Sequence, residues 1–215
     1  MTWLAWRQSR LQLLIAAAAL ALIALACGLT EPGLDHLYAE YGAHPAAFLA
    51  EVRTGGYPVL YFAGGAVMYL IPLVIGAFWG APMIARELEA GTHRLTWNQS
   101  VSRTRWLLVK IAIGGGAAMT FAGIAGLLLS WWAGPIDRVG GFPVGTSQLS
   151  RFAPIVFGTR GIVPIGAAAL AFMIGVTVGL LVRRTIPAMG LTLAVFAAAL
   201  VVMPLWISPH LITPA

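Results

Sequence analysis

Five long apolar runs constrain this chain more than any other feature, because each has about the length of a helix that crosses a membrane. None of them contains Asp, Glu, Lys, Arg or His. Only 9% of the 215 residues are charged, against about 25% in soluble domains. We therefore predict an all-α membrane protein, a polytopic bundle of about five transmembrane helices forming a single domain over residues 1–215. The predicted spans are 11–29, 57–82, 111–133, 161–182 and 186–207.

The distribution of Lys and Arg predicts the orientation. Segments 1–10, 83–110 and 183–185 hold two, five and two of these cations, which is nine of the thirteen in the chain. Because cytoplasmic segments of membrane proteins are enriched in Lys and Arg, we expect the N-terminus to be cytoplasmic. The net charge of +6 then reflects orientation, and nucleic acid is not an expected partner. We expect a multi-pass protein of the cytoplasmic membrane in contact with its lipid.

The segments outside the spans carry less specific sequence signals. Residues 1–10 combine two Trp with two Arg, which favours an interfacial lead-in helix, although a frayed terminus that only sets orientation fits equally. Segments 30–56 and 134–160 are expected to be outside loops, the first acidic and with one short helix from Gly33 to Tyr41. Cys27 follows an apolar run that imitates a lipoprotein signal, but a plain first span is the better interpretation. Pro72 is expected to kink the second span.

Several function classes are excluded because no ionisable residue lies in an apolar run. Ionisable groups inside the bilayer mark proton relays and intramembrane catalysis, so a proton-driven carrier and an intramembrane enzyme are not expected. The run Gly114–Gly116 lacks the Lys and Ser/Thr of a phosphate loop and indicates close helix packing. His36 and His44 in the outer loop allow at most a weak metal site. We therefore predict no catalytic residue, no metal and no cofactor bound by the chain.

The polar segment 83–110, which we call the elbow, joins the second and third spans. The second helix is expected to continue to Ala90 and end at Gly91, because glycine adopts the left-handed cap conformation without strain. Thr92 would then cap a short helix, 93–98, and Ser102 would cap the helix of the third span. Such an elbow can seat a small helix in a cleft of a cytosolic partner. The expected docking residues are Arg86, Glu87, Glu89, Gly91, Thr92, Leu95, Trp97, Asn98, Arg103 and Lys110.

A basic loop held by lipid headgroups is the alternative interpretation of the elbow. Arg103, Arg105 and Lys110 would serve for that purpose, but acidic residues such as Glu87 and Glu89 are unfavourable beside a membrane surface. The sequence therefore favours docking of a protein.

The elbow resembles the region between the second and third spans of type-2 ATP-binding-cassette (ABC) exporter permeases. The resemblance lies in the run RELEAGT from Arg86 to Thr92, then Leu95, Val101–Arg103 and Lys110. It implies a transmembrane permease subunit that pairs with a second permease, identical or different, and moves cargo with ATP and magnesium bound by a separate cytosolic ATPase docked on the elbow. Such permeases usually have six spans, so we expect the last span to be missing here. The cargo is not implied.

Two further groups of residues carry predictions. Tyr57, Tyr61 and Tyr69 share one helix face and are candidates to line a cargo pathway, although helix packing explains such a stripe as well. Two Gly-x-x-x-Gly pairs indicate close packing of helices within the subunit, and they comprise Gly76, Gly80, Gly175 and Gly179. The alternative function is a membrane interaction or sensor subunit that recruits a cytosolic partner and moves no cargo.

Overall fold

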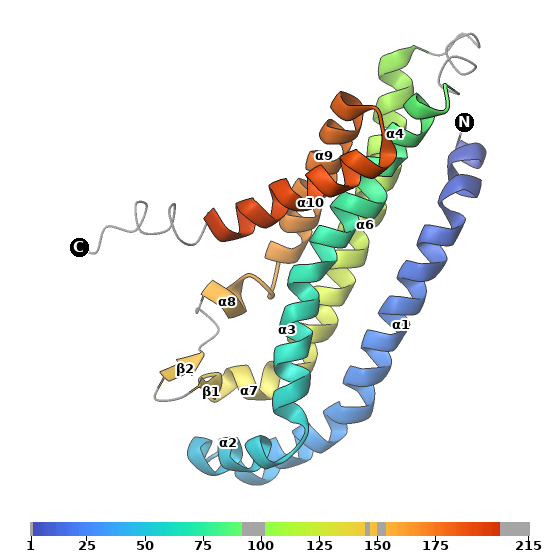
Figure 1. Cartoon of the computed structure of the whole chain (residues 1–215). Helices are drawn as coiled ribbons and strands as arrows, with labels where there is room; N and C mark the ends of the chain where they lie inside the picture. The colour runs from blue at the N-terminus through green and yellow to red at the C-terminus, as the bar shows by residue number, and fades with distance from the viewer. Residues whose placement is uncertain (1, 92–101, 145–146, 150–153, 203–215) are drawn as a thin grey trace. The chain divides into compact units, whose positions relative to one another are not determined.

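A computed structural model describes residues 2–91, 102–144, 147–149 and 154–202, and these are almost entirely helical (Figure 1). Within these ranges, five helices are long and apolar enough to cross a membrane, over Gln12–Tyr41, Tyr57–Glu89, Thr104–Trp132, Val163–Val182 and Thr185–Val202. The predicted class, an all-α bundle with five candidate spans, is therefore confirmed. The elements are α1 (Thr2–Tyr41), α2 (Pro45–Thr54), α3 (Tyr57–Val74), the π-helix η1 (Ile75–Gly80), α4 (Ala81–Glu89), α6 (Arg103–Trp132), α7 (Gly134–Arg138), β1 (Phe142–Val144), β2 (Ser147–Leu149), α8 (Pro154–Phe157), α9 (Val163–Val182) and α10 (Thr185–Val202).

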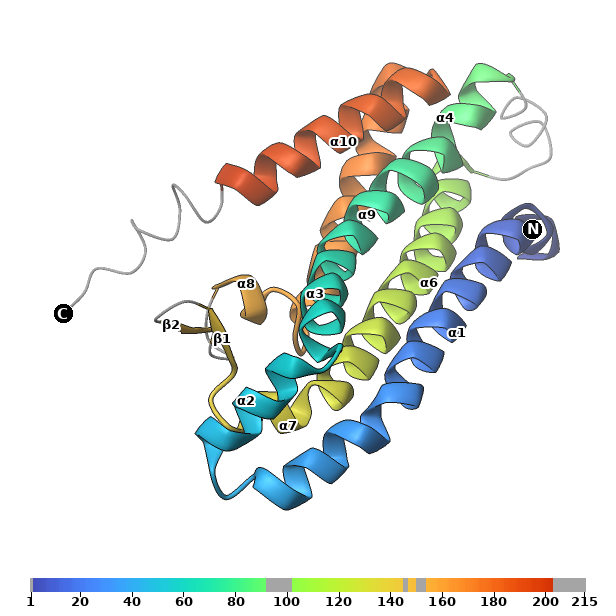
Figure 2. The same cartoon turned by 60° about the horizontal axis from the view of Figure 1, so that its bottom comes forward.

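Segment 30–56, predicted to be an outside loop with one short helix from Gly33 to Tyr41, is mostly helical. The stretch 33–41 is helical as predicted, but it is the end of α1 and not a separate short helix. Helix α1 continues through Pro32 to Tyr41, and α2 then turns back toward the start of α3 (Figure 2). A proline removes one helical hydrogen bond, here the one to the Gly28 carbonyl, and packing around the helix must outweigh that loss. The Thr30 hydroxyl donates to the Ala26 carbonyl at 2.8 Å and accepts the indole N–H of Trp132 at 2.8 Å. Leu34, one turn after Thr30, is fully buried. These contacts keep the helix continuous through Pro32.

Segment 134–160, predicted to be an outside loop, also contains regular structure. Helix α7 is followed by the antiparallel pair β1 and β2, in which Phe142 lies opposite Leu149. The Phe142 ring stacks on Tyr61 with 5.4 Å between ring centroids. This stacking places the start of the hairpin against helix α3.

The backbone divides into two compact units. The first comprises residues 1–10, 70–120 and 165–215, and the second comprises 11–69 and 121–164. In the first unit, α4 and η1 lie against α10, around a small core of Ala81, Ala85, Val178 and Ala188 (Figure 1). The second unit holds α2, α7, β1, β2 and α8 beside the parts of α1, α3 and α6 that belong to it.

A seam of glycines joins η1 to α9 in the first unit. A Cβ on Gly80 would lie 2.6 Å from the Phe172 carbonyl oxygen, and one on Gly179 would lie 2.6 Å from that of Ala81. A Cβ on Gly175 would overlap the carbonyl of Gly76. The four glycines of the two Gly-x-x-x-Gly pairs thus meet, and their missing side chains allow backbone-to-backbone contact.

The π-helical turn explains why so much backbone of η1 faces α9. The Ala81 N–H donates to the carbonyl of Gly76, five residues earlier, instead of four. This wider turn brings Gly76, Gly80 and Ala81 to the same side of the chain. Pro72, which was expected to kink this span, lies inside α3, and the irregular turn begins three residues later at Ile75.

Candidate functional site

The helix before the elbow ends one residue short of the predicted Ala90, and the helix after it begins at the predicted residue. Helix α4 ends at Glu89, and Gly91 has a φ of 69°, in the left-handed region. Helix α6 begins at Arg103, and the N–H of Arg105 donates to the Ser102 hydroxyl at 3.3 Å. The predicted short helix 93–98 and four of the predicted docking residues lie outside the described residues, so that part stays a prediction. Those four are Thr92, Leu95, Trp97 and Asn98.

An ion pair between Glu87 of α4 and Lys110 of α6 joins the two helices that flank the elbow. The Lys110 ammonium pairs with the Glu87 carboxylate, also reaches the Met83 carbonyl at 3.5 Å, and lies 5.1 Å from the centroid of the Trp106 ring. The side chains of Lys110 and Glu87 are only 12% and 17% exposed. The sequence assigned both residues to a docking surface, whereas the structure directs them toward each other and joins α4 to α6.

Glu89 caps a helix far away in sequence. Its carboxylate accepts the backbone N–H of Thr185 at 2.9 Å and the Thr185 hydroxyl at 2.7 Å. Thr185 is the first residue of α10, and a carboxylate is favourable there because the first N–H groups of a helix have no partner within the helix. The elbow is therefore tied to α10 as well as to α6.

The turn that Glu89 holds is strained. Helices α9 and α10 are joined through Arg183 and Arg184, and Arg183 has a φ of 57°. A left-handed residue other than glycine costs about 1 kcal/mol or more, so contacts around the turn must hold it. Sequence reasoning missed the pairing of Glu89 with Thr185. The available signal was an apolar helix that begins directly after a two-residue turn and needs a cap.

The other described elbow residues are placed as follows. Arg86 is exposed on α4, and Gly91 is partly buried at its end. Arg103 begins α6, and its side chain lies outside the description. Of the ten predicted docking residues, the structure thus brings Glu87 and Lys110 together and sends Glu89 to α10.

The tyrosine stripe of α3 separates into two environments. Tyr61 and Tyr69 line a cavity of about 200 Å³ in the second unit. Tyr57 does not line that cavity, and its hydroxyl lies 2.6 Å from the position that a Cβ on Gly33 would take. Two of the three residues predicted to line a pathway therefore face the same cavity, and the third packs against α1.

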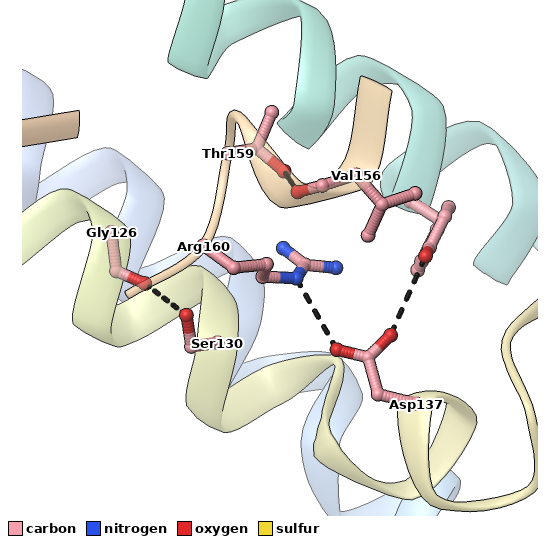
Figure 3. Close-up of polar contacts among 7 residues, drawn as sticks. Gly126, Ser130, Asp137, Val156, Thr159 and Arg160 are labelled. Atoms are coloured by element: carbon pink, nitrogen blue, oxygen red, sulfur yellow. Dashed lines mark hydrogen bonds and ion pairs between the residues drawn. The ribbon is translucent and has the colours of Figure 1, made fainter. Parts of the chain in front are cut away.

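A buried ion pair that the sequence did not indicate stands beside this cavity. Arg160 Nε lies 3.3 Å from Asp137 Oδ2, and the Tyr61 hydroxyl donates to Asp137 Oδ1 at 3.4 Å (Figure 3). The side chains of Arg160 and Asp137 are 6% and 11% exposed. Both had been assigned to an outside loop, and their separation of 23 residues gave no signal of pairing.

No group of three or more His, Cys, Asp or Glu side chains that could hold a metal ion occurs among the described residues. His36, one of the two outer-loop histidines considered for a weak site, lies on α1 with its Nδ1 atom 3.8 Å from the Glu40 carboxylate.

Five membrane-length helices and a polar elbow between the second and third define a multi-pass α-helical membrane protein. The chain belongs to the family described as ABC-2 membrane transporter related, whose family model matches residues 4–208. Comparison with curated proteins and with solved structures gives no match. The family match agrees with the predicted class, the membrane subunit of an ABC transporter.

Proposed function

We propose that this chain is the permease subunit of an exporter in the cytoplasmic membrane, driven by a separate cytosolic ATPase docked on the elbow 83–110. The observation that carries the proposal is the pair of links made by Glu87 to Lys110 and by Glu89 to Thr185. Through them, one short cytoplasmic segment is connected to α4, α6 and α10. A partner that grips the elbow thereby acts on three membrane helices.

The packing behind the elbow suits the transmission of force. Helix α4 continues from η1, whose glycines contact the backbone of α9 with no side chain between. Interiors packed this closely move as units because they have little room to deform. A displacement of α4 is therefore expected to carry α9 and α10 with it.

The energy for transport is assigned to the partner. The apolar runs of the chain contain no ionisable side chain, and coupling to an ion gradient relies on such groups. ATP and magnesium would be bound by the ATPase, and this chain would remain non-catalytic. A second permease, identical or different, would complete the passage for the cargo, whose identity the proposal leaves open.

The test is docking of the ATPase on the elbow. The chain is purified from its native membrane in mild detergent, and the co-eluting ATP-binding-cassette protein is identified by mass spectrometry and by its magnesium-dependent ATP hydrolysis. Leu95→Ala/Trp97→Ala should abolish co-elution, because these are the two large apolar side chains of the predicted short helix. The matched control is Leu127→Ala/Trp131→Ala, which changes the same residue types at exposed positions of α6, 68% and 52% exposed.

Two results would contradict the proposal. Either no ATP-binding-cassette protein co-elutes with the unmodified chain, or co-elution and ATP hydrolysis survive the Leu95/Trp97 variant unchanged. Recovery of a cytosolic partner without ATPase activity would instead support the non-transporting interaction or sensor subunit.

A further inference from the structure

The cavity beside α3 lies wholly within the second unit and has an aromatic wall. Tyr61, Phe62 and Tyr69 contribute rings, and Gly65, Thr159 and Arg160 complete most of the lining. The rings are held in place: Tyr61 stacks on Phe142 at 5.4 Å, and Phe62 lies edge-on to both, at 5.7 Å from Tyr61 and 5.4 Å from Phe142. A wall of fixed rings favours a flat apolar or aromatic occupant.

One charged side chain of the wall offers hydrogen-bond donors. Arg160 is 6% exposed, its Nε bonds to Asp137, and its Cζ lies 5.4 Å from the centroid of the Tyr61 ring. A guanidinium carries five N–H donors. The ion pair uses one of them (Figure 3), and a further hydrogen bond joins the guanidinium to the Tyr61 hydroxyl. The site therefore keeps donor capacity at a buried position, where a hydrogen bond is stronger than in water.

The charge of the site selects against an anion. Asp137 neutralises Arg160, so a bound carboxylate would add an uncompensated charge to a cavity whose lining is mainly apolar. A neutral acceptor such as a carbonyl oxygen gains the hydrogen bond without that cost.

The volume sets the size of the occupant. A cavity of about 150 Å³ is known to hold benzene, whereas pockets for drug-sized ligands start at about 300 Å³. At about 200 Å³, this cavity holds a substituted ring, either a small molecule or one end of a longer one.

We propose that this cavity is a binding site for an uncharged aromatic carbonyl compound, whose ring packs between Tyr61 and Tyr69 and whose oxygen accepts a hydrogen bond from Arg160. The proposal goes beyond the permease function and does not rest on docking at the elbow.

Photolabelling with benzophenone, an uncharged aromatic ketone, tests the site on the full chain in detergent. Labelled peptides should map to residues 61–69 and 156–160. Gly65→Leu should reduce this labelling at least about tenfold, because a Cβ on Gly65 has nothing within 4 Å and the longer side chain would fill the space. Gly28→Leu is the matched control, since Gly28 lies in α1 and its added Cβ also meets nothing within 4 Å. Labelling that is unchanged in the Gly65 variant, or that maps elsewhere, overturns the proposal.

Competition separates the acceptor from the ring. Acetophenone should displace benzophenone about tenfold better than ethylbenzene, which has nearly the same shape but no acceptor, because a hydrogen bond to a charged group is lost. Benzoate should compete less well than acetophenone. Equal competition by ethylbenzene would overturn the role of Arg160, and stronger competition by benzoate would overturn the uncharged ligand.

Discussion

Two ion pairs of this protein have similar chemistry and different surroundings. In the first unit, Lys110 pairs with Glu87 and lies 5.1 Å from the centroid of the Trp106 ring. In the second unit, Arg160 pairs with Asp137 and lies 5.4 Å from the centroid of the Tyr61 ring. The side chains of both pairs are largely buried, so each pair is expected to contribute more to stability than a pair of exposed surface charges does.

The two ion pairs differ in the groups that surround them. Lys110 also donates a hydrogen bond to the Met83 carbonyl of α4. Helix α4 directly follows η1, whose glycines pack closely against α9. Arg160 borders an open cavity and keeps donors beyond those its ion pair uses. The same combination of cation, carboxylate and aromatic ring thus joins α4 to α6 at Lys110 and forms part of the cavity wall at Arg160.

The largest expected effect comes from breaking the more buried pair. Arg160→Met leaves the Asp137 carboxylate without its cation and should cost about 3–5 kcal/mol of unfolding free energy, measured by denaturant titration in detergent micelles. Arg160→Met/Asp137→Asn should recover much of that loss, because the orphaned charge is removed while an acceptor for Tyr61 remains. If the double variant is no more stable than the single one, the pair is not what stabilises this region.

The glycine seam should show the next largest effect. Gly175→Ala places a methyl group against the backbone of Gly76 and should cost about 3 kcal/mol, seen as a lower thermal midpoint. Gly65→Ala, where the added Cβ meets open space, should be neutral or stabilise by up to about 1 kcal/mol. Equal midpoints for the two variants would show that η1 and α9 are not in backbone contact.

The smallest effect is expected at the cap on α10. Glu89→Ala and Thr185→Ala should each lower the thermal midpoint slightly, because Glu89 is exposed and water replaces part of the lost hydrogen bonds. The informative result is the combination: the double variant should be no less stable than the worse single variant, since both remove the same interaction. Additive losses would mean that the two residues act independently.

Local sequence was a good guide wherever neighbouring residues decide the structure. The five spans follow from uninterrupted apolar runs, and the end of α4 follows from a glycine that tolerates a positive φ. The cap at Ser102 follows from a hydroxyl placed before a helix. The partial miss at 30–56 has the opposite origin. Pro32 and the acidic residues indicate a loop with only a short helix, but burial of Leu34 and the hydrogen bond between Trp132 and Thr30 keep α1 continuous to Tyr41.

By itself, then, the sequence determined the class of the protein, because insolubility of apolar helices in water and the cost of unpaired backbone in lipid depend only on composition and length. Only the tertiary structure decided which polar groups meet. Glu89 reaches Thr185 and Asp137 reaches Arg160 because segments that are separated along the chain pack side by side. Local sequence can indicate that the start of α10 needs a cap, but packing selects the group that supplies it.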